Sequence, residues 1–230
     1  MTLQLLLQNS PRLHEDPSGK LTSWQISDAV LNFLNKHVDS NSVTLETGAG
    51  LSTVLFAMKS ASHTCIVPDL KLIRRIQSYC HDNQISCNNI AFKAGISEQI
   101  LPSLELGNLD LVLIDGRHAF PTPFIDWYYT CEKLKVGGMM IVDDTQIWTG
   151  AILKKFLLFE PEWKLTADLS SKTAIFVKIK EYSHSKEWLD QSLVINKSRY
   201  SIMASKINRG LEALRQGNFG KIFGKVANPT

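Results

Sequence analysis

Short apolar runs alternate with helix-like segments between residues 42 and 180, and this alternation constrains the fold more than any other feature. Parallel strands need long crossover connections, which helices supply, so the alternation predicts a mostly parallel sheet. A first helix is expected over 22–38, where apolar residues recur at helical spacing. The predicted strands are 42–46, 63–67, 89–95, 109–115, 139–144, 163–169 and 173–180.

The order of these elements predicts a three-layer, doubly wound α/β fold with helices on both faces of one sheet. The run 109–115 is almost wholly apolar, which indicates a strand buried on both faces. The runs 163–169 and 173–180 follow one another closely, so we expect an antiparallel pair that closes the sheet. The expected sheet therefore has seven strands, mostly parallel, with one antiparallel. Ligands of such sheets bind at the carboxyl ends of the strands.

The length of 230 residues suits one α/β domain with modest additions. We expect a lead-in over 1–21, the main domain over 22–180 and an extension over 181–230. From Lys197 onward the extension holds seven basic residues and one acid, Glu212. It is expected to form a solvated helix on the domain edge. The alternatives are an arm for homo-oligomer formation or a docking segment for an anionic partner.

Composition argues against several classes of function. The net charge of +3 is too small to indicate a nucleic-acid partner. No stretch approaches about 18 consecutive apolar residues, so no membrane span is expected. The four cysteines include no CxxC pair, which favours thiols in a reducing compartment over a metal or disulfide role. A cytoplasmic protein is therefore expected.

A Gly-Ala-Gly turn follows the first strand directly and opens a helix, in the run VTLETGAGLSTVLF. Glycine lets the backbone turn tightly and approach a ligand closely. Dinucleotide-binding folds place pyrophosphate on such a turn and usually carry a third glycine. Here Thr53 stands in that third position. The carboxylate of Glu46, two residues before the first glycine, would repel a pyrophosphate and suit a cationic ligand group.

The run E-x-G-x-G-x-S resembles motif I of class I S-adenosylmethionine-dependent methyltransferases, in which this turn holds the methionine part of the cofactor. The resemblance implies S-adenosylmethionine as cofactor and a Rossmann-like methyltransferase fold. It implies cofactor contacts at Glu46, Thr47, Gly48, Gly50 and Ser52.

Two further strand ends bear on cofactor binding. In this family an acid at the end of the second strand grips the cofactor ribose, but Val67 stands there and the nearest carboxylate is Asp69. Asp69 either takes over the ribose hydroxyls or caps the following helix. Ile96 and Ser97 fall where the family contacts adenine, although Ser97 could equally cap a helix. We include Asp69, Ile96 and Ser97 among the expected cofactor contacts.

Acidic residues follow two strands that should be neighbours. Asp115 and His118 come after the fourth strand, and Asp143 and Asp144 after the fifth. Adjacent strand ends lie about 5 Å apart, so these carboxylates would repel one another unless a cation, donor or ligand compensates. Oxygen-rich clusters of this kind suit Mg²⁺, Mn²⁺ or Ca²⁺.

The pair of runs IDGRHAF and GGMMIVDDTQIW resembles a small class I methyltransferase subfamily with D-x-x-H and GG-φφφ-DD, where φ is apolar. It is also similar to the cation-dependent O-methyltransferases. That similarity implies a divalent metal held by Asp115, Asp143 and Asp144. Asp144 stands where those enzymes commonly have Asn, and His118 where they often have Lys.

The resemblance implies a methyltransferase that methylates a hydroxyl of a small molecule or sugar by in-line displacement. A metal would lower the pKa of that hydroxyl, or His118 would remove its proton. Asp115 is thus expected both as a catalytic residue and as a cofactor contact. Two alternatives stay open: an NAD(P)-dependent oxidoreductase, with Asp69 as its ribose acid, and a non-catalytic binding protein on the same fold.

Overall fold

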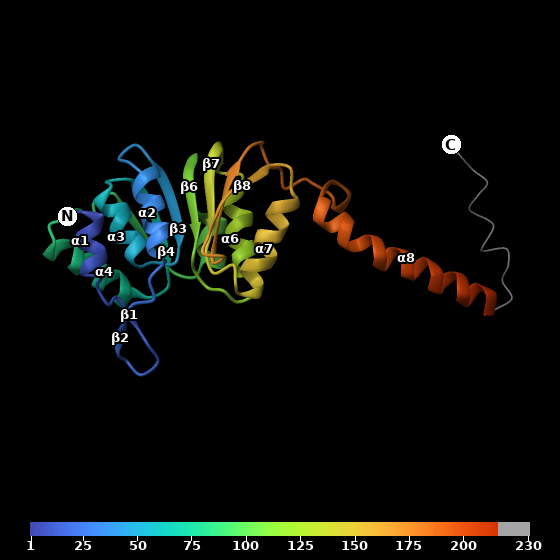
Figure 1. Cartoon of the computed structure of the whole chain (residues 1–230), viewed down its shortest axis with the longest axis horizontal. Helices are drawn as coiled ribbons and strands as arrows, with labels where there is room; N and C mark the ends of the chain where they lie inside the picture. Colours follow the sequence, from blue (N-terminus) through green and yellow to red (C-terminus); the bar gives the residue numbers. More distant parts are fainter. Residues whose placement is uncertain (216–230) are drawn as a thin grey trace. The chain divides into compact units, whose positions relative to one another are not determined.

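The computed structural model describes residues 1–215 (Figure 1). The chain divides between His184 and Ser185 into two units. The first unit contains one large sheet with helices around it. The expected domain limits at residues 21 and 180 stay a prediction.

A seven-stranded sheet forms the centre of the first unit, in the order β5-β4-β3-β6-β7-β9-β8. Strand β9 runs antiparallel to both of its neighbours, and the other pairs are parallel. The expected α/β fold is confirmed, including the single antiparallel strand. The strands are β3 Val43–Thr47, β4 Ser62–Val67, β5 Ile90–Ala94, β6 Leu109–Ile114, β7 Leu134–Val142, β8 Trp163–Leu169 and β9 Thr173–Lys178.

Helices pack apolar side chains against both faces of this sheet. The first four helices share one core cluster with residues of the central strands. Trp127 and Leu153, on later helices, are buried outside that cluster, as a three-layer arrangement requires. The helices of this unit are α1 Leu3–Gln8, α2 Asp28–His37, α3 Leu51–Met58, α4 Leu70–Asp82, α5 Ser97–Ile100, α6 Thr122–Cys131 and α7 Trp148–Phe159, with a 3₁₀ turn η1 at Leu101–Ser103.

The N-terminal lead-in has more structure than its turn-rich sequence indicates. It contains α1 and a two-stranded ribbon formed by β1 His14–Glu15 and β2 Leu21–Thr22. His14 Nε2 lies 2.9 Å from the carbonyl oxygen of Ala49, so the lead-in reaches the glycine turn. The helix α2 begins later than expected, because the hydroxyl of Ser27 caps it.

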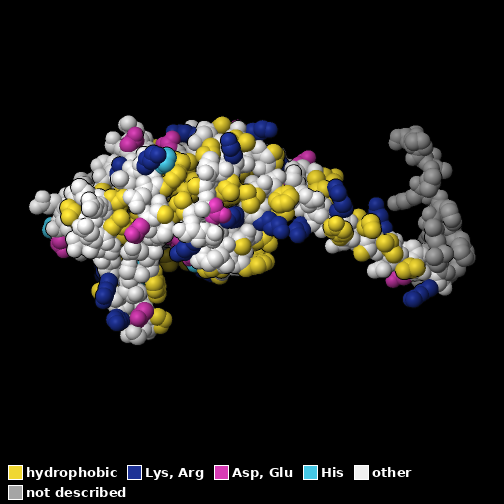
Figure 2. Space-filling view, viewed as in Figure 1, with side chains coloured by type: hydrophobic (Ala, Val, Ile, Leu, Met, Phe, Trp, Pro, Cys, Tyr) yellow, Lys and Arg dark blue, Asp and Glu magenta, His cyan; other side chains and the backbone are white. Residues whose placement is uncertain are grey.

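The second unit contains a 3₁₀ turn, η2 Trp188–Asp190, and the long helix α8 Ser192–Arg215. Figure 2 shows basic and hydrophobic side chains along this helix, and Tyr200, Met203 and Ile207 are exposed. The last part of the expected extension, 216–230, lies outside the described residues. Over the part of the chain that is described, each helix is too short or too polar to cross a membrane. The expected cytoplasmic location and the absence of a nucleic-acid partner stay predictions.

A buried lysine ties the antiparallel strand β9 to the start of β7. Lys178 is fully buried, and its ammonium group donates to the carbonyl oxygens of Cys131 and Leu134 at 3.1 and 2.7 Å. A third bond, of 2.8 Å, goes to the carboxylate of Glu181. Buried carbonyl groups are costly when they lose their donor, so this lysine stabilises the junction between the end of β9 and the start of β7, at the end of the sheet where β7 begins.

We predict that Lys178→Met lowers the free energy of unfolding by about 2–4 kcal/mol, because two carbonyl groups lose their donor. Chemical denaturation followed by circular dichroism measures this change. Lys135→Met is the matched control, since the exposed pair of Lys135 with Asp110 should contribute less than about 1 kcal/mol. An equal effect of both substitutions would show that the buried bonds do not stabilise β9.

Candidate active site

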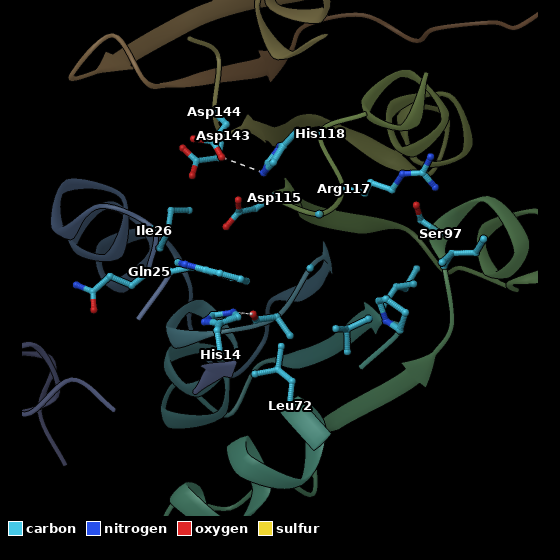
Figure 3. Close-up of a pocket in the computed structure, with 18 of the residues that line it drawn as sticks. His14, Gln25, Ile26, Leu72, Ser97, Asp115, Arg117, His118, Asp143 and Asp144 are labelled. Atoms are coloured by element: carbon cyan, nitrogen blue, oxygen red, sulfur yellow. Dashed lines mark hydrogen bonds and ion pairs between the residues drawn. The ribbon is translucent and has the colours of Figure 1, made fainter. Parts of the chain in front are cut away.

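A cavity of about 670 Å³ opens at the carboxyl ends of the parallel strands (Figure 3). Residues that follow β3, β4, β5, β6 and β7 all contribute to its wall, together with part of the lead-in. This is where open α/β sheets bind ligands. The described residues at its wall that bear on the argument are Trp24, Gly48, Val67, Ile96, Ser97, Asp115, His118, Asp143, Asp144 and Lys172.

The glycine turn is held closely between two strands. Gly48 has a φ of +95°, and a Cβ on it would lie 2.2 Å from the carbonyl oxygen of Asp115. The N–H of Gly48 donates to the carbonyl oxygen of Ile66 at 2.9 Å. The N–H of Asp115 donates to the carbonyl oxygen of Thr47 at 3.1 Å. Glycine is therefore required at this position for both conformation and space.

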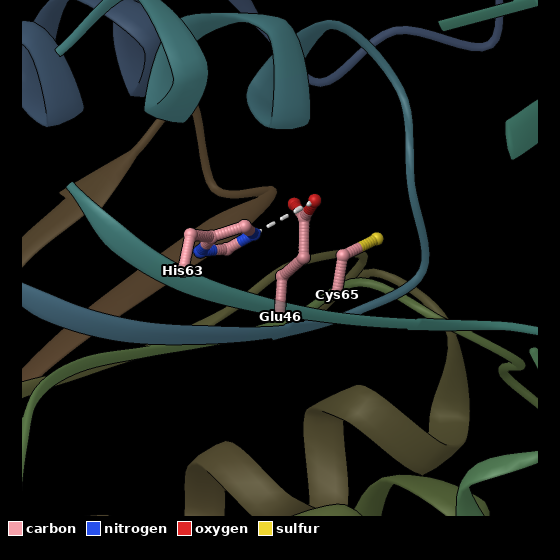
Figure 4. Close-up of side chains that lie close together, drawn as sticks. All are labelled: Glu46, His63 and Cys65. Atoms are coloured by element: carbon pink, nitrogen blue, oxygen red, sulfur yellow. Dashed lines mark ion pairs between the residues drawn. The ribbon is translucent and has the colours of Figure 1, made fainter. Parts of the chain in front are cut away.

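Glu46 is not part of the cavity wall, and its side chain lies close to those of His63 and Cys65 (Figure 4). Its carboxylate is 1% exposed and accepts hydrogen bonds from the hydroxyls of Ser52, at 2.7 Å, and of Thr53. His63 Nε2 lies 3.2 Å from the same carboxylate, and its ring stacks on Phe56. The side chains of Glu46 and Ser52 are thus bonded to each other in the interior, and their expected cofactor contacts stay predictions.

The buried carboxylate instead shapes the turn from below. The hydroxyl oxygen of Thr53, held by Glu46, accepts the N–H of Gly50 at 3.0 Å. Cys65, beside Glu46, donates its thiol to the carbonyl oxygen of Gly48 at 3.4 Å. An acidic residue before the turn therefore fixes the path of the backbone. Its carboxylate is not part of the cavity wall.

Thr47 and Asp69 also lie away from the cavity wall. Thr47 is buried and donates its hydroxyl to Asp126 on α6 at 2.7 Å. Burial raises the pKa of Asp126 to about 6. Asp69 caps α4 through the N–H groups of its first turn and pairs with Arg75 at 3.4 Å. Of its two expected roles, the structure shows capping, while Val67 is the residue that reaches the cavity.

Except for Gly50, the other predicted cofactor contacts lie at the cavity. Gly48 lines one side, and Ile96 and Ser97 line the wall after β5. Ile96 is the N-cap residue of α5, so Ser97 is not the cap that its sequence context suggested. Gly50 is set back: a Cβ on it would meet the ring of His14 at 3.2 Å.

The predicted acidic cluster is also present, at the other end of the cavity (Figure 3). His118 Nε2 lies 2.9 Å from Asp144, and single ligand atoms of Asp115, His118 and Asp144 lie within 4.8 Å of one another. Asp143 is 4% exposed and accepts the hydroxyl of Thr173. Burial raises the pKa of Asp115 well above its usual range, and the charges of Asp143 and Asp144 raise it further.

The comparisons with known proteins agree with this geometry. Residues 45–145, which contain the glycine turn and the acidic cluster, match a family model described as a methyltransferase domain. The chain carries a methyltransferase domain. This match confirms the resemblance to class I S-adenosylmethionine-dependent methyltransferases and the expectation of an enzyme of that class. Among curated proteins no sequence matches significantly.

Solved structures share the fold of this methyltransferase. A proposed caffeoyl-CoA O-methyltransferase from Staphylococcus aureus has a TM-score of 0.58 and 16% identity, covering 67% of this chain and 85% of that chain. A proposed O-methyltransferase from Klebsiella pneumoniae gives 0.60 and 15%, covering 77% and 96%. A proposed methyltransferase from Streptococcus mutans, in complex with SAH, gives 0.52 and 12%, covering 67% and 99%. These similarities concern the fold.

A lysine that the sequence analysis missed enters the acidic cluster of the methyltransferase. Lys172 follows β8, and its ammonium nitrogen lies 3.3 Å from Asp144 and 3.9 Å from Asp143. Its carbonyl oxygen accepts the N–H and the hydroxyl of Thr145, at 2.8 and 3.0 Å. No motif marks this residue, because the hairpin between β8 and β9 is distant in sequence from both acidic runs.

The donors around the carboxylates bear on the expected metal. One oxygen of Asp144 accepts from Gln146 at 2.6 Å and faces Lys172, and the other faces His118. Asp143 is turned to Thr173 and Lys172. A divalent ion would have to displace these donors and lie next to an ammonium group. The residues therefore do not fit a resident metal with open positions, and we derive no step through one.

We predict that Glu46→Gln lowers the free energy of unfolding by about 1–3 kcal/mol, because a neutral amide replaces a buried carboxylate that accepts two hydroxyls. The affinity for S-adenosylhomocysteine should fall less than about tenfold, since the turn loosens but no ligand contact is lost. Denaturation and calorimetry measure the two effects, with the exposed Glu105→Gln as control. A large loss of affinity at unchanged stability would instead indicate direct contact between Glu46 and the ligand.

Proposed function

We propose that this methyltransferase methylates a hydroxyl oxygen of a small-molecule acceptor, with His118 as the general base. The observation that carries the proposal is the His118–Asp144 pair, 2.9 Å apart at the wall of the cavity. A base must lie within hydrogen-bond reach of the proton that it removes, and this pair faces the same space as the glycine turn.

The cavity offers a place for S-adenosylmethionine along the predicted contacts. Gly48 would lie against the methionine part, while Ile96 and Ser97 would lie against adenine. The carboxylate of Asp115 faces the cavity, and no group within residues 1–215 donates a hydrogen bond to it. A cationic group of the cofactor would form an ion pair with the carboxylate of Asp115. The sequence suggested such a pairing for Glu46. When bound, the cofactor supplies an electrophilic methyl group.

The contact with Asp144 defines the chemistry of the His118 ring. When Nε2 donates its N–H to the carboxylate, Nδ1 carries no proton. Nδ1 can then take the proton from the hydroxyl of the substrate that is to be methylated. Asp144 also stabilises the positive charge that the ring gains when it takes that proton. The backbone carbonyl oxygen of His118 accepts the hydroxyl of Thr149 at 2.6 Å, which fixes the loop that carries the base. The proton thus moves from the acceptor oxygen to Nδ1.

Two exposed aromatic residues support an acceptor that contains a ring. Phe120 and Trp148 are 63% and 62% exposed, and their ring centroids lie 5.9 Å apart. They follow His118 and Asp144 closely in the chain. Exposed aromatic faces suit the flat side of a phenol or the C–H face of a sugar. The same pair argues against a purely structural role for this surface.

We predict that S-adenosylhomocysteine binds this protein with measurable heat, whereas NADH does not. The turn lacks the third glycine of dinucleotide sites, and Asp69, the candidate ribose acid, caps α4 instead. Isothermal titration calorimetry with both compounds on the full chain tests this. Binding of NADH without S-adenosylhomocysteine would overturn the proposal and favour an oxidoreductase.

A second prediction concerns the base. His118→Ala should lower kcat about 10²–10⁴-fold, because no group remains to take the proton. The affinity for S-adenosylhomocysteine should stay within about threefold, since the base faces the acceptor. Release of S-adenosylhomocysteine is measured with a panel of phenols and sugars. His81→Ala, at an exposed histidine on α4, should leave kcat unchanged. Full activity of His118→Ala would exclude the ring as base.

A further inference from the structure

We propose that Lys172 supplies the positive charge of the acidic site, in the place where the similarity to cation-dependent O-methyltransferases implied a divalent metal. The inference concerns the same site as the proposed function, but it can be tested without an acceptor. It depends on contacts around Asp143 and Asp144 and not on any property of the cofactor.

The ammonium group of Lys172 lies where a counter-ion is needed. Asp115, Asp143 and Asp144 gather at adjoining strand ends, and such carboxylates repel one another without compensation. Lys172 Nζ contacts the two acids after β7, at 3.9 and 3.3 Å. The side chain of Lys172 is 36% exposed, so it keeps contact with water and carries the ordinary positive charge of a lysine.

The backbone of Lys172 is fixed, which distinguishes it from a mobile surface lysine. Its carbonyl oxygen accepts two hydrogen bonds from Thr145, the residue after Asp144. The next residue, Thr173, donates its hydroxyl to Asp143. The turn before it contains Ser170 and Ser171, both with positive φ. The hairpin between β8 and β9 is thus joined to the loop after β7 at Lys172 and at the following residue, Thr173.

A fixed ammonium differs chemically from a bound metal. It supplies a positive charge to the cluster and contacts Asp144, which also contacts His118, so that the base stays oriented. It offers no vacant coordination positions, whereas a divalent ion in such a site binds two substrate oxygens at once. The site therefore does not require an acceptor with two adjacent hydroxyls. We infer that acceptors with a single hydroxyl group are accepted.

The test is a titration of the full-length protein with Mn²⁺, in which electron paramagnetic resonance measures the free ion. The wild type should show no binding up to about 1 mM, because the ammonium occupies the place of the ion. Lys172→Met should bind Mn²⁺ at least about tenfold more tightly, since the carboxylates lose their cation. Lys172→Arg, which keeps the charge, should resemble the wild type.

Lys154→Met is the matched control, because it removes a lysine paired with Asp168 at 2.5 Å, outside the cavity. It should leave Mn²⁺ binding unchanged. S-adenosylhomocysteine affinity confirms that each variant is folded. If Lys172→Met does not fold, the wild type and Lys172→Arg decide the question. A Kd of the wild type for Mn²⁺ below about 1 mM, or equal Mn²⁺ affinity in Lys172→Met and the wild type, would overturn the proposal. Neither outcome bears on whether His118 is the base.

Discussion

The close approach of Gly48 to the carbonyl oxygen of Asp115 is the contact on which the site depends. It brings the turn after β3 against the end of β6, so that the cofactor loop and the acidic cluster share one cavity. The buried carboxylate of Glu46 holds this turn from below through Ser52 and Thr53. The turn is thus shaped by an interior hydrogen-bond network before any ligand binds, which reduces the ordering that binding requires.

Electrostatics then divides the cavity between two tasks. Asp115 faces the cavity without a donor from the described chain, which suits a cationic ligand group. Asp143 and Asp144 are engaged by Thr173, His118 and Lys172. The acids that a sequence presents as one group are therefore inequivalent in space. Asp115 is available to a ligand, whereas Asp143 and Asp144 contact His118, Lys172 and Thr173.

The sequence predicted the parts that follow from local pattern. Strand–helix alternation predicted the seven-stranded sheet. The residues after the strands were predicted to form the site, and the cavity is lined by Gly48, Ile96, Ser97, Asp115, His118, Asp143 and Asp144. The sequence did not reveal the direction of Glu46 and Thr47, whose cofactor contacts stay predictions. Neighbouring side chains of a strand point to opposite faces, so Glu46 meets α3 and Thr47 meets α6. Neither side chain then extends past the end of β3 into the cavity.

The sequence by itself determined the fold class, the methyltransferase domain and the carboxylates at the strand ends, because periodicity and motif spacing are local properties of the chain. Only the tertiary structure decided which charges meet. Lys172 joins Asp143 and Asp144 through a hairpin that returns antiparallel beside β7, and His14 reaches the glycine turn from the lead-in. Contacts between segments far apart in sequence depend on how the sheet closes, and no local pattern records that.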